Sequence, residues 1–388
     1  MTEAVIVAVA RTAIGRARKG SLVDVDAFEL ARTALGGAIG RSGIPADEID
    51  DLVLAESMQG GGVIGRYVAV EMGLAQVPAL ADNRHCAAGL SAIQIAAGSI
   101  RAGMDRVVVA GGTESLSSMP KVLKSVPASA QDYRPWASAS HPETPAAPAW
   151  DMSVTVGDNT ARLAGVTREQ ADEWALHSHL RAAACVERGW FDDEIVPVNL
   201  PGGGGVFDTD EHPRADTTLG RLAALKVLHP ENEAAVVTAG NSAGLNDAAA
   251  AVVVTSDDYA AANGLTPLAR VVSWASAGVP PERTGLAPTI AIPKALSRAG
   301  MKVTDVDLFE INEAFATVGV ACSRILGIDH GIVNVNGSGC GLGHPVAATG
   351  ARMVITMLGE LRRRGQRVGC VSMCAGGGMG SALVLEML

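Results

Sequence analysis

The chain carries the same order of strands and helices twice, and this restricts it to a duplicated α/β fold. Residues 43–57 (GIPADEIDDLVLAES) and 300–314 (GMKVTDVDLFEINEA) share a glycine, two acidic residues, an apolar strand and a glutamate. The leading glycines precede Cys86 and His344 by 43 and 44 residues. Because halves that match element by element indicate a duplication, we expect Cys86 and His344 at equivalent helix starts.

Strands and helices alternate in each half, which predicts a mostly parallel sheet covered by helices on both faces. In the first half, strands are expected at residues 4–9, 49–55, 107–110 and 248–255. Helices are expected at 26–39, before Cys86 and directly after it. In the second half, strands are expected at 269–276, 307–311, 332–336 and 368–373, with helices at 292–299, after 314 and up to Arg364.

The region between the halves has a different character. Residues 117–150 are rich in Pro, Ser and Ala, residues 167–188 form one well-capped helix, and residues 201–216 are polar and glycine-rich. We interpret this region as an inserted lobe, which beside a nucleophile usually serves as a lid or binding lobe. The expected division is residues 1–116 with 245–268 as the N-terminal half, 117–244 as the insertion, and 269–388 as the C-terminal half.

Composition excludes several classes of protein. The 388 residues are 48% hydrophobic and 19% charged, which is typical of a globular protein. The net charge of −10 and the absence of a long basic run argue against nucleic acid as a partner. The sequence lacks a membrane-spanning apolar run and a basic leader, so we expect a cytoplasmic protein. The spacing of the six cysteines predicts neither disulfides nor a structural metal site.

Cys86 stands near the start of residues 82–100 (DNRHCAAGLSAIQIAAGSI), which predict a buried helix that is apolar on all sides. The first turn of a helix has unpaired N–H groups and the positive end of the dipole, so we expect a thiol there to ionise. Since the thiolate attacks carbonyl groups, Cys86 is a candidate nucleophile. Free cysteines are also often small core residues, so the assignment depends on finding a base, an acid and an oxyanion site.

Three further segments carry such groups. His344 lies in GLGHPVAATGAR, directly before a proline at a predicted helix start, and a histidine commonly activates a thiol. Cys374 begins CAGGGMG at the end of the last predicted parallel strand, where a thiol can move a proton and glycine N–H groups can bind an oxyanion. Asn312 and Glu313 follow the strand at 307–311 and either cap a helix or reach into the site. Taken alone, each of these groups also fits a structural role.

Together, these groups fall at strand ends on one edge of the predicted sheets. A Cys/His/Cys set with an asparagine and glycine N–H donors is what acyl transfer through a thioester requires. The remaining candidates receive no catalytic role. They are His85, His177, His179 and Cys340. His177 and His179 are two residues apart on a predicted helix and cannot share a face.

Four blocks in this order resemble the thiolase family, the acetyl-CoA acyltransferases: NRHCAAGL, VTAGNSAGLNDAAAA, NEAFA, and GHPVAATGAR with the terminal CAGGGMG. The resemblance covers nearly the whole chain. It implies two βαβαβαββ halves packed as five layers (αβαβα) with an inserted loop domain. It also implies an acyltransferase of fatty acid metabolism, such as β-oxidation, that cleaves 3-ketoacyl-CoA with CoA or condenses two acetyl-CoA molecules by ping-pong exchange.

The resemblance implies a role for each candidate. Cys86 is the acylated nucleophile, and His344 activates it and forms the first oxyanion hole with a water held by Asn312. Cys374 is the acid and base, and the N–H groups of Cys86 and Gly376 form the second oxyanion hole. Family members bind coenzyme A against the loop domain, use no metal or redox cofactor, and form homodimers or homotetramers. The residues expected to line the CoA and acyl site are Arg214, Arg221, Ala239, Ala243, Leu245, Ala314 and Phe315.

Two departures from the family pattern bear on substrate binding. The family commonly has NASG where this chain has Asn241-Ser242-Ala243-Gly244, so a serine that usually contacts pantetheine is displaced by one position. Ala347 replaces a glycine that the family commonly has beside the site. Neither change removes a catalytic group, and both bear on acyl-chain preference and CoA affinity.

Two alternatives stay open at this point. A decarboxylating ketoacyl synthase shares the fold but uses one Cys with two His, which the second thiol at Cys374 argues against. A catalytically silent, thiolase-like scaffold or lipid-carrier subunit is disfavoured by the complete catalytic set, although the altered pantetheine block keeps it in view.

Overall fold

The first half of the chain forms a five-stranded part of the central sheet. The computed structural model describes residues 2–59, 61–127 and 129–388. The strand order is β4-β3-β5-β10-β1, with bounds Ala79–Asp82, Asp51–Ala55, Val107–Ser115, Asn246–Ser256 and Ala4–Arg11. β3 runs parallel to β4 and β5, whereas β10 is antiparallel to β5 and β1.

The second half repeats this pattern. Its order is β12-β13-β14-β11, with bounds Leu308–Ile311, Val368–Ala375, Met379–Met387 and Ala269–Gly278. β12 and β13 are parallel and the other pairs are antiparallel, as in β3-β5-β10-β1. The expectation of a mostly parallel sheet is therefore wrong, because β1, β10, β11 and β14 all pair antiparallel. β1 and β11 pair over two residues each, so that with β2 (Gly15–Arg16), which pairs with β10, the halves form one ten-stranded sheet.

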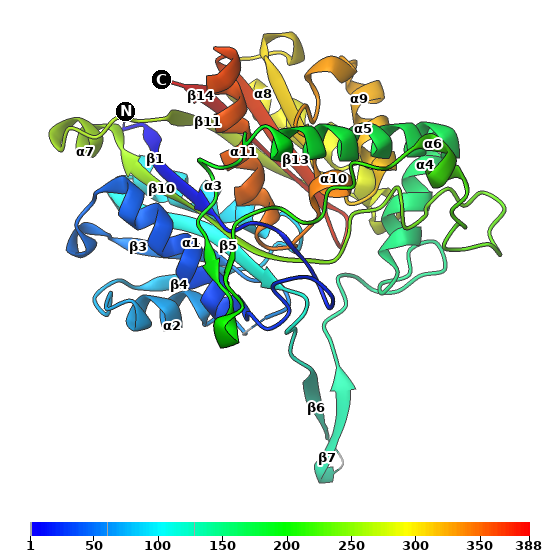
Figure 1. Cartoon of the computed structure of the whole chain (residues 1–388), viewed down its shortest axis with the longest axis horizontal. Coiled ribbons are helices and arrows are strands. Elements are labelled where there is room, and N and C mark those ends of the chain that lie inside the picture. Colours follow the sequence, from blue (N-terminus) through cyan, green and yellow to red (C-terminus); the bar gives the residue numbers. More distant parts are fainter. Residues whose placement is uncertain (1, 60, 128) are drawn as a thin grey trace.

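Helices cover the outer faces of both halves and also fill the space between them (Figure 1). α1 (Ala27–Ser42) and α2 (Ile64–Glu71) pack on the first half, and α8 (Pro288–Arg298) packs on β11 and β14. α3 (Ala88–Arg101) and α11 (Thr349–Arg364) pack against each other and contact strands of both halves. This is the five-layer helix–sheet–helix–sheet–helix order expected from the sequence.

β5 shows why the central strands contain long apolar runs. Successive side chains of a strand point to opposite faces of the sheet. Val107 and Val109 therefore belong to the core under α1, whereas Val108 and Ala110 belong to the core around α3 and α11. Because both faces are covered by helices, no position of this strand can be polar without a partner.

The helices of the insertion lie mainly against the second half, whereas residues 182–207 also contribute to the core of the first half. α4 (Asn159–Ala164), α5 (Arg168–Glu187) and α6 (Leu219–Ala223) form its helical part, and α5 packs against α9 (Ala316–Leu326) and α10 (Gly339–Leu342). Thr167 and Gln170 form the capping box expected at the start of α5. The hairpin of β6 (Val122–Val126) and β7 (Ser129–Trp136) projects from the body (Figure 1). The remaining elements are β8 (Val198–Asn199), β9 (Val206–Phe207) and α7 (Asp257–Ala262).

The strand expected at residues 332–336 is wrong. Only Val333 forms a bridge, to Phe309 of β12. The next residue, Asn334, has a left-handed φ of 48° and turns the chain away. Its side-chain amide then accepts from the Ile311 N–H and donates to the Ile311 C=O, both at 2.8 Å. One side chain thus takes the hydrogen bonds that a neighbouring strand would make.

Within the described residues, no helix combines the length and the apolar character that crossing a bilayer requires.

Candidate active site

Cys86 lies just before α3, in a tight turn that begins with Arg84. The N–H groups of Ala87 and Ala88 donate to the carbonyls of Arg84 and His85, both at 3.0 Å. His85 has a left-handed φ of 46°, a conformation that costs energy for a residue with a Cβ and that often occurs at functional sites. The turn presents Cys86 with partial exposure at the head of the buried helix.

The expectation that the helix start ionises Cys86 is wrong for the free protein. Burial raises the pKa of Cys86 to about 11, and the nearby Glu114 carboxylate adds to this rise. The backbone N–H groups of Cys86 and Gly376 near the sulfur lower its pKa, but by less than burial raises it. Cys86 is therefore a thiol at neutral pH and needs a base to become a nucleophile.

His344 is held in the tautomer that a base requires. Its Nδ1 lies 2.7 Å from Thr349 Oγ1, and the Thr349 hydroxyl donates its own proton to the Pro345 C=O at 2.8 Å. Thr349 therefore accepts, so Nδ1 carries the hydrogen and Nε2 carries the lone pair. Burial lowers the pKa of His344 to about 3, which keeps the ring neutral. Nε2 is buried and has no hydrogen-bond partner among the described residues.

Asn312 lies directly after β12 with a fully buried side chain. Neither Nδ2 nor Oδ1 has a partner among the described residues. A Cβ added to Gly339 would lie 2.8 Å from Asn312 Oδ1, so the loop before His344 passes close to this amide. A buried amide normally has partners, and an amide without them in a polar site is suited to hold a water molecule or a ligand oxygen.

Cys374 is buried near the carboxyl end of β13, where open α/β sheets bind their ligands. Burial raises the pKa of this thiol well above its ordinary value, and the neighbouring thiols of Cys86 and Cys322 contribute in the same direction. Cys374 is therefore protonated at rest and close enough to Cys86 for their charges to interact. The chain continues to Gly376, whose N–H reaches the Cys86 sulfur.

The loop after His344 brings the two halves together. A Cβ on Gly89 or on Gly112 would lie 2.4 Å or 2.1 Å from the Ala347 carbonyl oxygen. Only glycine leaves room for this contact between α3, β5 and the His344 loop. The structure therefore gathers Cys86, Cys374 and Gly376 at one point and sets the His344 loop against the same helix start.

The seven expected substrate-lining residues fall into two groups. Ala243 donates its N–H to the Ala314 C=O at 3.0 Å, and Ser242 pairs with Phe315 in a β-bridge, which brings this group together. The displaced Ser242 hydroxyl donates to the Thr238 C=O at 2.7 Å. The other group is exposed on the insertion or at its end: Arg214, Arg221, Ala239 and Leu245. Arg221 is paired with Asp216.

Sequence reasoning missed three residues that support His344. Thr349 sets its tautomer, Asn246 accepts the His344 N–H at 3.0 Å, and Glu114 accepts the Ala347 N–H at 3.0 Å. A glutamate at the end of the apolar strand VVVAGGTES was a visible signal, because a buried charge needs partners. No comparable signal in the sequence marks the other two residues. The role of Asn246 depends on a contact between distant segments, and that of Thr349 depends on the Pro345 carbonyl.

Among the described residues, no group of three or more side chains is arranged to hold a metal ion. The fold is a duplicated five-layer arrangement, and its halves meet at two thiols and a neutral histidine. These features are those of an acyltransferase that works through a thioester. The chain belongs to the thiolase family, a family of acyltransferases: residues 4–258 match the description Thiolase, N-terminal domain, and residues 265–387 match Thiolase, C-terminal domain.

Individual relatives agree with this assignment. The chain is 41% identical to an acetyl-CoA acetyltransferase of Cupriavidus necator, with all of both chains covered. It matches the crystal structure of the Bacillus anthracis acetyl-CoA acetyltransferase with a TM-score of 0.92 and 40% identity, covering 100% and 99% of the two chains. It matches human mitochondrial 3-ketoacyl-CoA thiolase in complex with CoA with a TM-score of 0.89 and 31% identity, covering 100% and 98%.

Proposed function

We propose that this thiolase transfers acyl groups between CoA thioesters by a ping-pong mechanism with an acyl-Cys86 intermediate. The observation that carries the proposal is the His344 tautomer, because it leaves a base with a free lone pair, held neutral by burial, in a site that contains two thiols. The substrates are 3-ketoacyl-CoA with CoA, or two acetyl-CoA molecules in the reverse direction.

In the first half-reaction, His344 Nε2 takes the proton of Cys86, and the thiolate attacks the 3-keto carbon. The bond between C2 and C3 breaks, the acyl group stays on Cys86, and the acetyl-CoA carbanion takes a proton from Cys374. The oxyanions that form are stabilised at two places. The N–H groups of Cys86 and Gly376 bind one, and protonated His344 with a water held by Asn312 binds the other.

In the second half-reaction, the Cys374 thiolate takes the proton of CoA. The CoA sulfur attacks the acyl carbonyl, and Cys86 leaves and recovers its proton from His344. The same groups serve condensation when the steps run backwards, so the site favours neither direction by itself. This account needs only CoA thioesters, and we include no metal or redox cofactor in it.

The division of the chain and the CoA site are part of the proposal. Residues 1–116 with 245–268 and residues 269–388 form the two thiolase halves, and the insertion 117–244 binds CoA. Exposed Arg214 and Arg221 suit the phosphates of CoA. Ala243, which is hydrogen-bonded to Ala314, and Phe315, which is bridged to Ser242, suit the pantetheine arm. The human relative of similar fold was solved with CoA bound.

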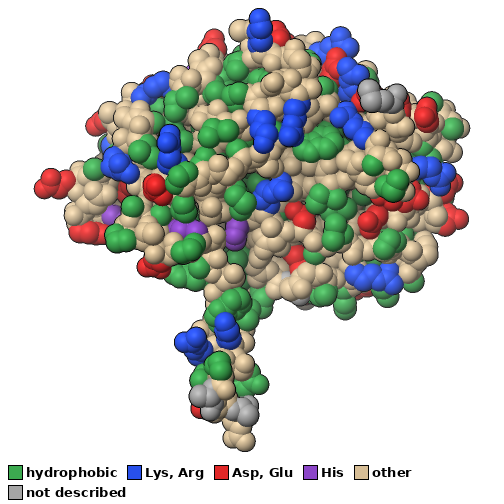
Figure 2. Space-filling view, turned by 180° about the vertical axis from the view of Figure 1, so that it is seen from behind, with side chains coloured by type: hydrophobic (Ala, Val, Ile, Leu, Met, Phe, Trp, Pro, Cys, Tyr) green, Lys and Arg blue, Asp and Glu red, His purple; other side chains and the backbone are tan. Residues whose placement is uncertain are grey.

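We further propose a cytoplasmic homodimer or homotetramer that acts in fatty acid metabolism, including β-oxidation. Two exposed features support self-association. β4 is the last strand of the sheet, with Leu80 47% exposed. The projecting hairpin carries apolar side chains, including Leu123 and Tyr133, next to basic ones (Figure 2).

The test is intact-mass analysis after brief incubation with acetyl-CoA or acetoacetyl-CoA. An acetyl adduct is expected on the wild type and on Cys370→Ala, a matched control four residues before Cys374 in the same buried strand. It is expected to be absent from Cys86→Ala and to disappear when CoA is added. No adduct from either donor would refute the proposal and favour a silent scaffold or lipid carrier.

A further inference from the structure

The loop that carries His344 is held almost entirely by side chains from other segments. Five of its backbone N–H groups, those of residues 338, 340, 341, 344 and 347, donate to side-chain oxygens. The acceptors come from α5, β10, the end of β12 and the end of β5: Ser178, Asn246, Glu313 and Glu114. A loop fixed at so many points has little freedom to move its histidine.

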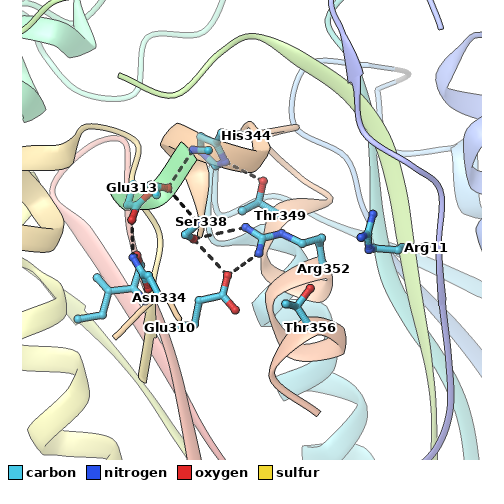
Figure 3. Close-up of polar contacts among 12 residues, drawn as sticks. Arg11, Glu310, Glu313, Asn334, Ser338, His344, Thr349, Arg352 and Thr356 are labelled. Atoms are coloured by element: carbon cyan, nitrogen blue, oxygen red, sulfur yellow. Dashed lines mark hydrogen bonds and ion pairs between the residues drawn. The ribbon is translucent and has the colours of Figure 1, made fainter. Parts of the chain in front are cut away.

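Glu313 holds the beginning of this loop. Its Oε2 accepts from the Cys340 N–H at 3.0 Å and from Ser178 Oγ at 2.5 Å. Its Oε1 accepts from Trp174 Nε1 at 2.8 Å and from Asn334 Nδ2 at 2.7 Å. Figure 3 shows Glu313 and Ser338 close to His344, above the buried pair of Glu310 and Arg352.

Glu114 holds the end of the loop in the same way. Its Oε2 accepts from the Ala347 N–H at 3.0 Å and from Ser57 Oγ at 2.5 Å. Its Oε1 accepts from Gln59 Nε2 at 2.8 Å and from the Met58 N–H at 3.2 Å. The two glutamates come from different halves of the molecule, and both are buried.

We propose that Glu114 and Glu313 are positioning residues that hold the loop from Cys340 to Ala347 at both ends, so that His344 Nε2 faces Cys86. The inference rests on the proposed function, since it assumes that His344 activates Cys86. Neither glutamate is assigned a chemical step. Each acts through the loop backbone.

A carboxylate is needed at both positions because every partner donates. A glutamine has an NH₂ group in place of one of the two carboxylate oxygens. Whichever way the amide is turned, this NH₂ group faces backbone or side-chain donors instead of acceptors. Glu→Gln keeps the size of the side chain but leaves a buried donor without an acceptor, which forces the loop to move.

Glu194 provides a matched control. It is buried, and its Oε2 accepts from Arg11 Nε at 2.9 Å and from Thr356 Oγ1 at 3.1 Å. Neither donor belongs to the His344 loop or to the segment that binds Glu114. Glu194→Gln therefore places the same substitution at a buried carboxylate elsewhere, and its effect measures what a buried amide at such a site does to stability alone.

The experiment measures the rate of Cys86 acetylation by acetyl-CoA, the steady-state kcat and KM, and the thermal unfolding midpoint. Glu114→Gln and Glu313→Gln are expected to slow acetylation by about tenfold or more, as for one lost hydrogen bond in a buried site, with KM for CoA unchanged. Glu194→Gln is expected to lower the unfolding midpoint while acetylation stays at the wild-type rate.

A second readout separates the two glutamates. Glu114 raises the pKa of Cys86 through its charge. Alkylation of Cys86 by iodoacetamide should therefore begin at lower pH in Glu114→Gln than in the wild type, and at the same pH in Glu313→Gln. This shift reports the lost charge of Glu114, whereas the slowed acetylation and unchanged KM report the displaced loop. If Glu114→Gln does not fold, Gln59→Leu removes one of its donors and should slow acetylation in the same direction.

The outcomes are distinct. Wild-type acetylation rates in both loop variants, or an equal loss in Glu194→Gln, would overturn the positioning role. A wild type that is not acetylated on Cys86 would instead refute the proposed function.

Discussion

The hydroxyl of Thr349 is expected to set the rate at which Cys86 is acylated, although it does not touch the substrate. Thr349→Val keeps the shape of the side chain and removes the acceptor that holds the proton on His344 Nδ1. The imidazole then either keeps a buried N–H unpaired, at a cost of about 1–3 kcal/mol, or moves the proton to Nε2. In the second case, Nε2 has no lone pair with which to take the Cys86 proton.

Since about 1.4 kcal/mol corresponds to a factor of ten in rate, acetylation of Cys86 should slow by roughly 5- to 150-fold. The assay is the time course of the acetyl adduct by intact mass, with kcat for acetoacetyl-CoA thiolysis alongside.

Thr356→Val is the control. Thr356 lies two turns later on the same helix, is equally buried, and donates to Glu194 at 3.1 Å, outside the site (Figure 3). It should lose stability on the order of 1 kcal/mol and keep the wild-type acetylation rate. The reasoning about the tautomer is refuted if Thr349→Val acylates as fast as the wild type, or if both valine variants slow it equally.

Three further predictions follow from the geometry. Gly112→Ala places a Cβ 2.1 Å from the Ala347 carbonyl oxygen, so this variant should lose about 1–3 kcal/mol of stability and most of its activity. The control is Gly40→Ala, at an exposed position of α1 with no atom within 4 Å of the added Cβ. It should be neutral or slightly stabilising in a melting experiment. Because the pKa of Cys86 is raised to about 11, its alkylation in the free enzyme should rise steadily between pH 6 and 9, and a plateau in that range would contradict the burial argument. Leu80→Lys places a charge on the exposed edge strand β4 and should reduce the mass measured by light scattering; an unchanged mass would show that this edge does not join subunits.

The sequence contained most of the information that positions the candidate catalytic groups. The spacing within the two repeats predicted that Cys86 and His344 stand at corresponding places, and the structure places the His344 loop against the start of α3. The buried strands β5 and β10 were predicted from their apolar runs, because such runs leave few alternatives.

Three features could not be predicted from the sequence: the protonation state of Cys86, the missing strand at 332–336 and the tautomer of His344. Each depends on how distant segments pack or on backbone contacts. Helix-start effects on Cys86 were visible in the sequence, but the larger effect of burial depends on how the halves pack. The strand expected at 332–336 has the right composition, yet the left-handed turn and the amide of Asn334 replace it. The tautomer of His344 depends on the carbonyl of Pro345, which no side-chain pattern reveals.

Asn334 also makes the two edges of the ten-stranded sheet unequal. At one end, β12 has its outer edge occupied, because Asn334 takes both backbone groups of Ile311 and Val333 pairs with Phe309. At the other end, β4 pairs with β3 and, among the described residues, has no further strand beside it. A sheet with a single open edge can pair with only one further strand. When two copies pair through their β4 edges, neither copy keeps an open edge, so the sheet cannot grow into a fibre by this route.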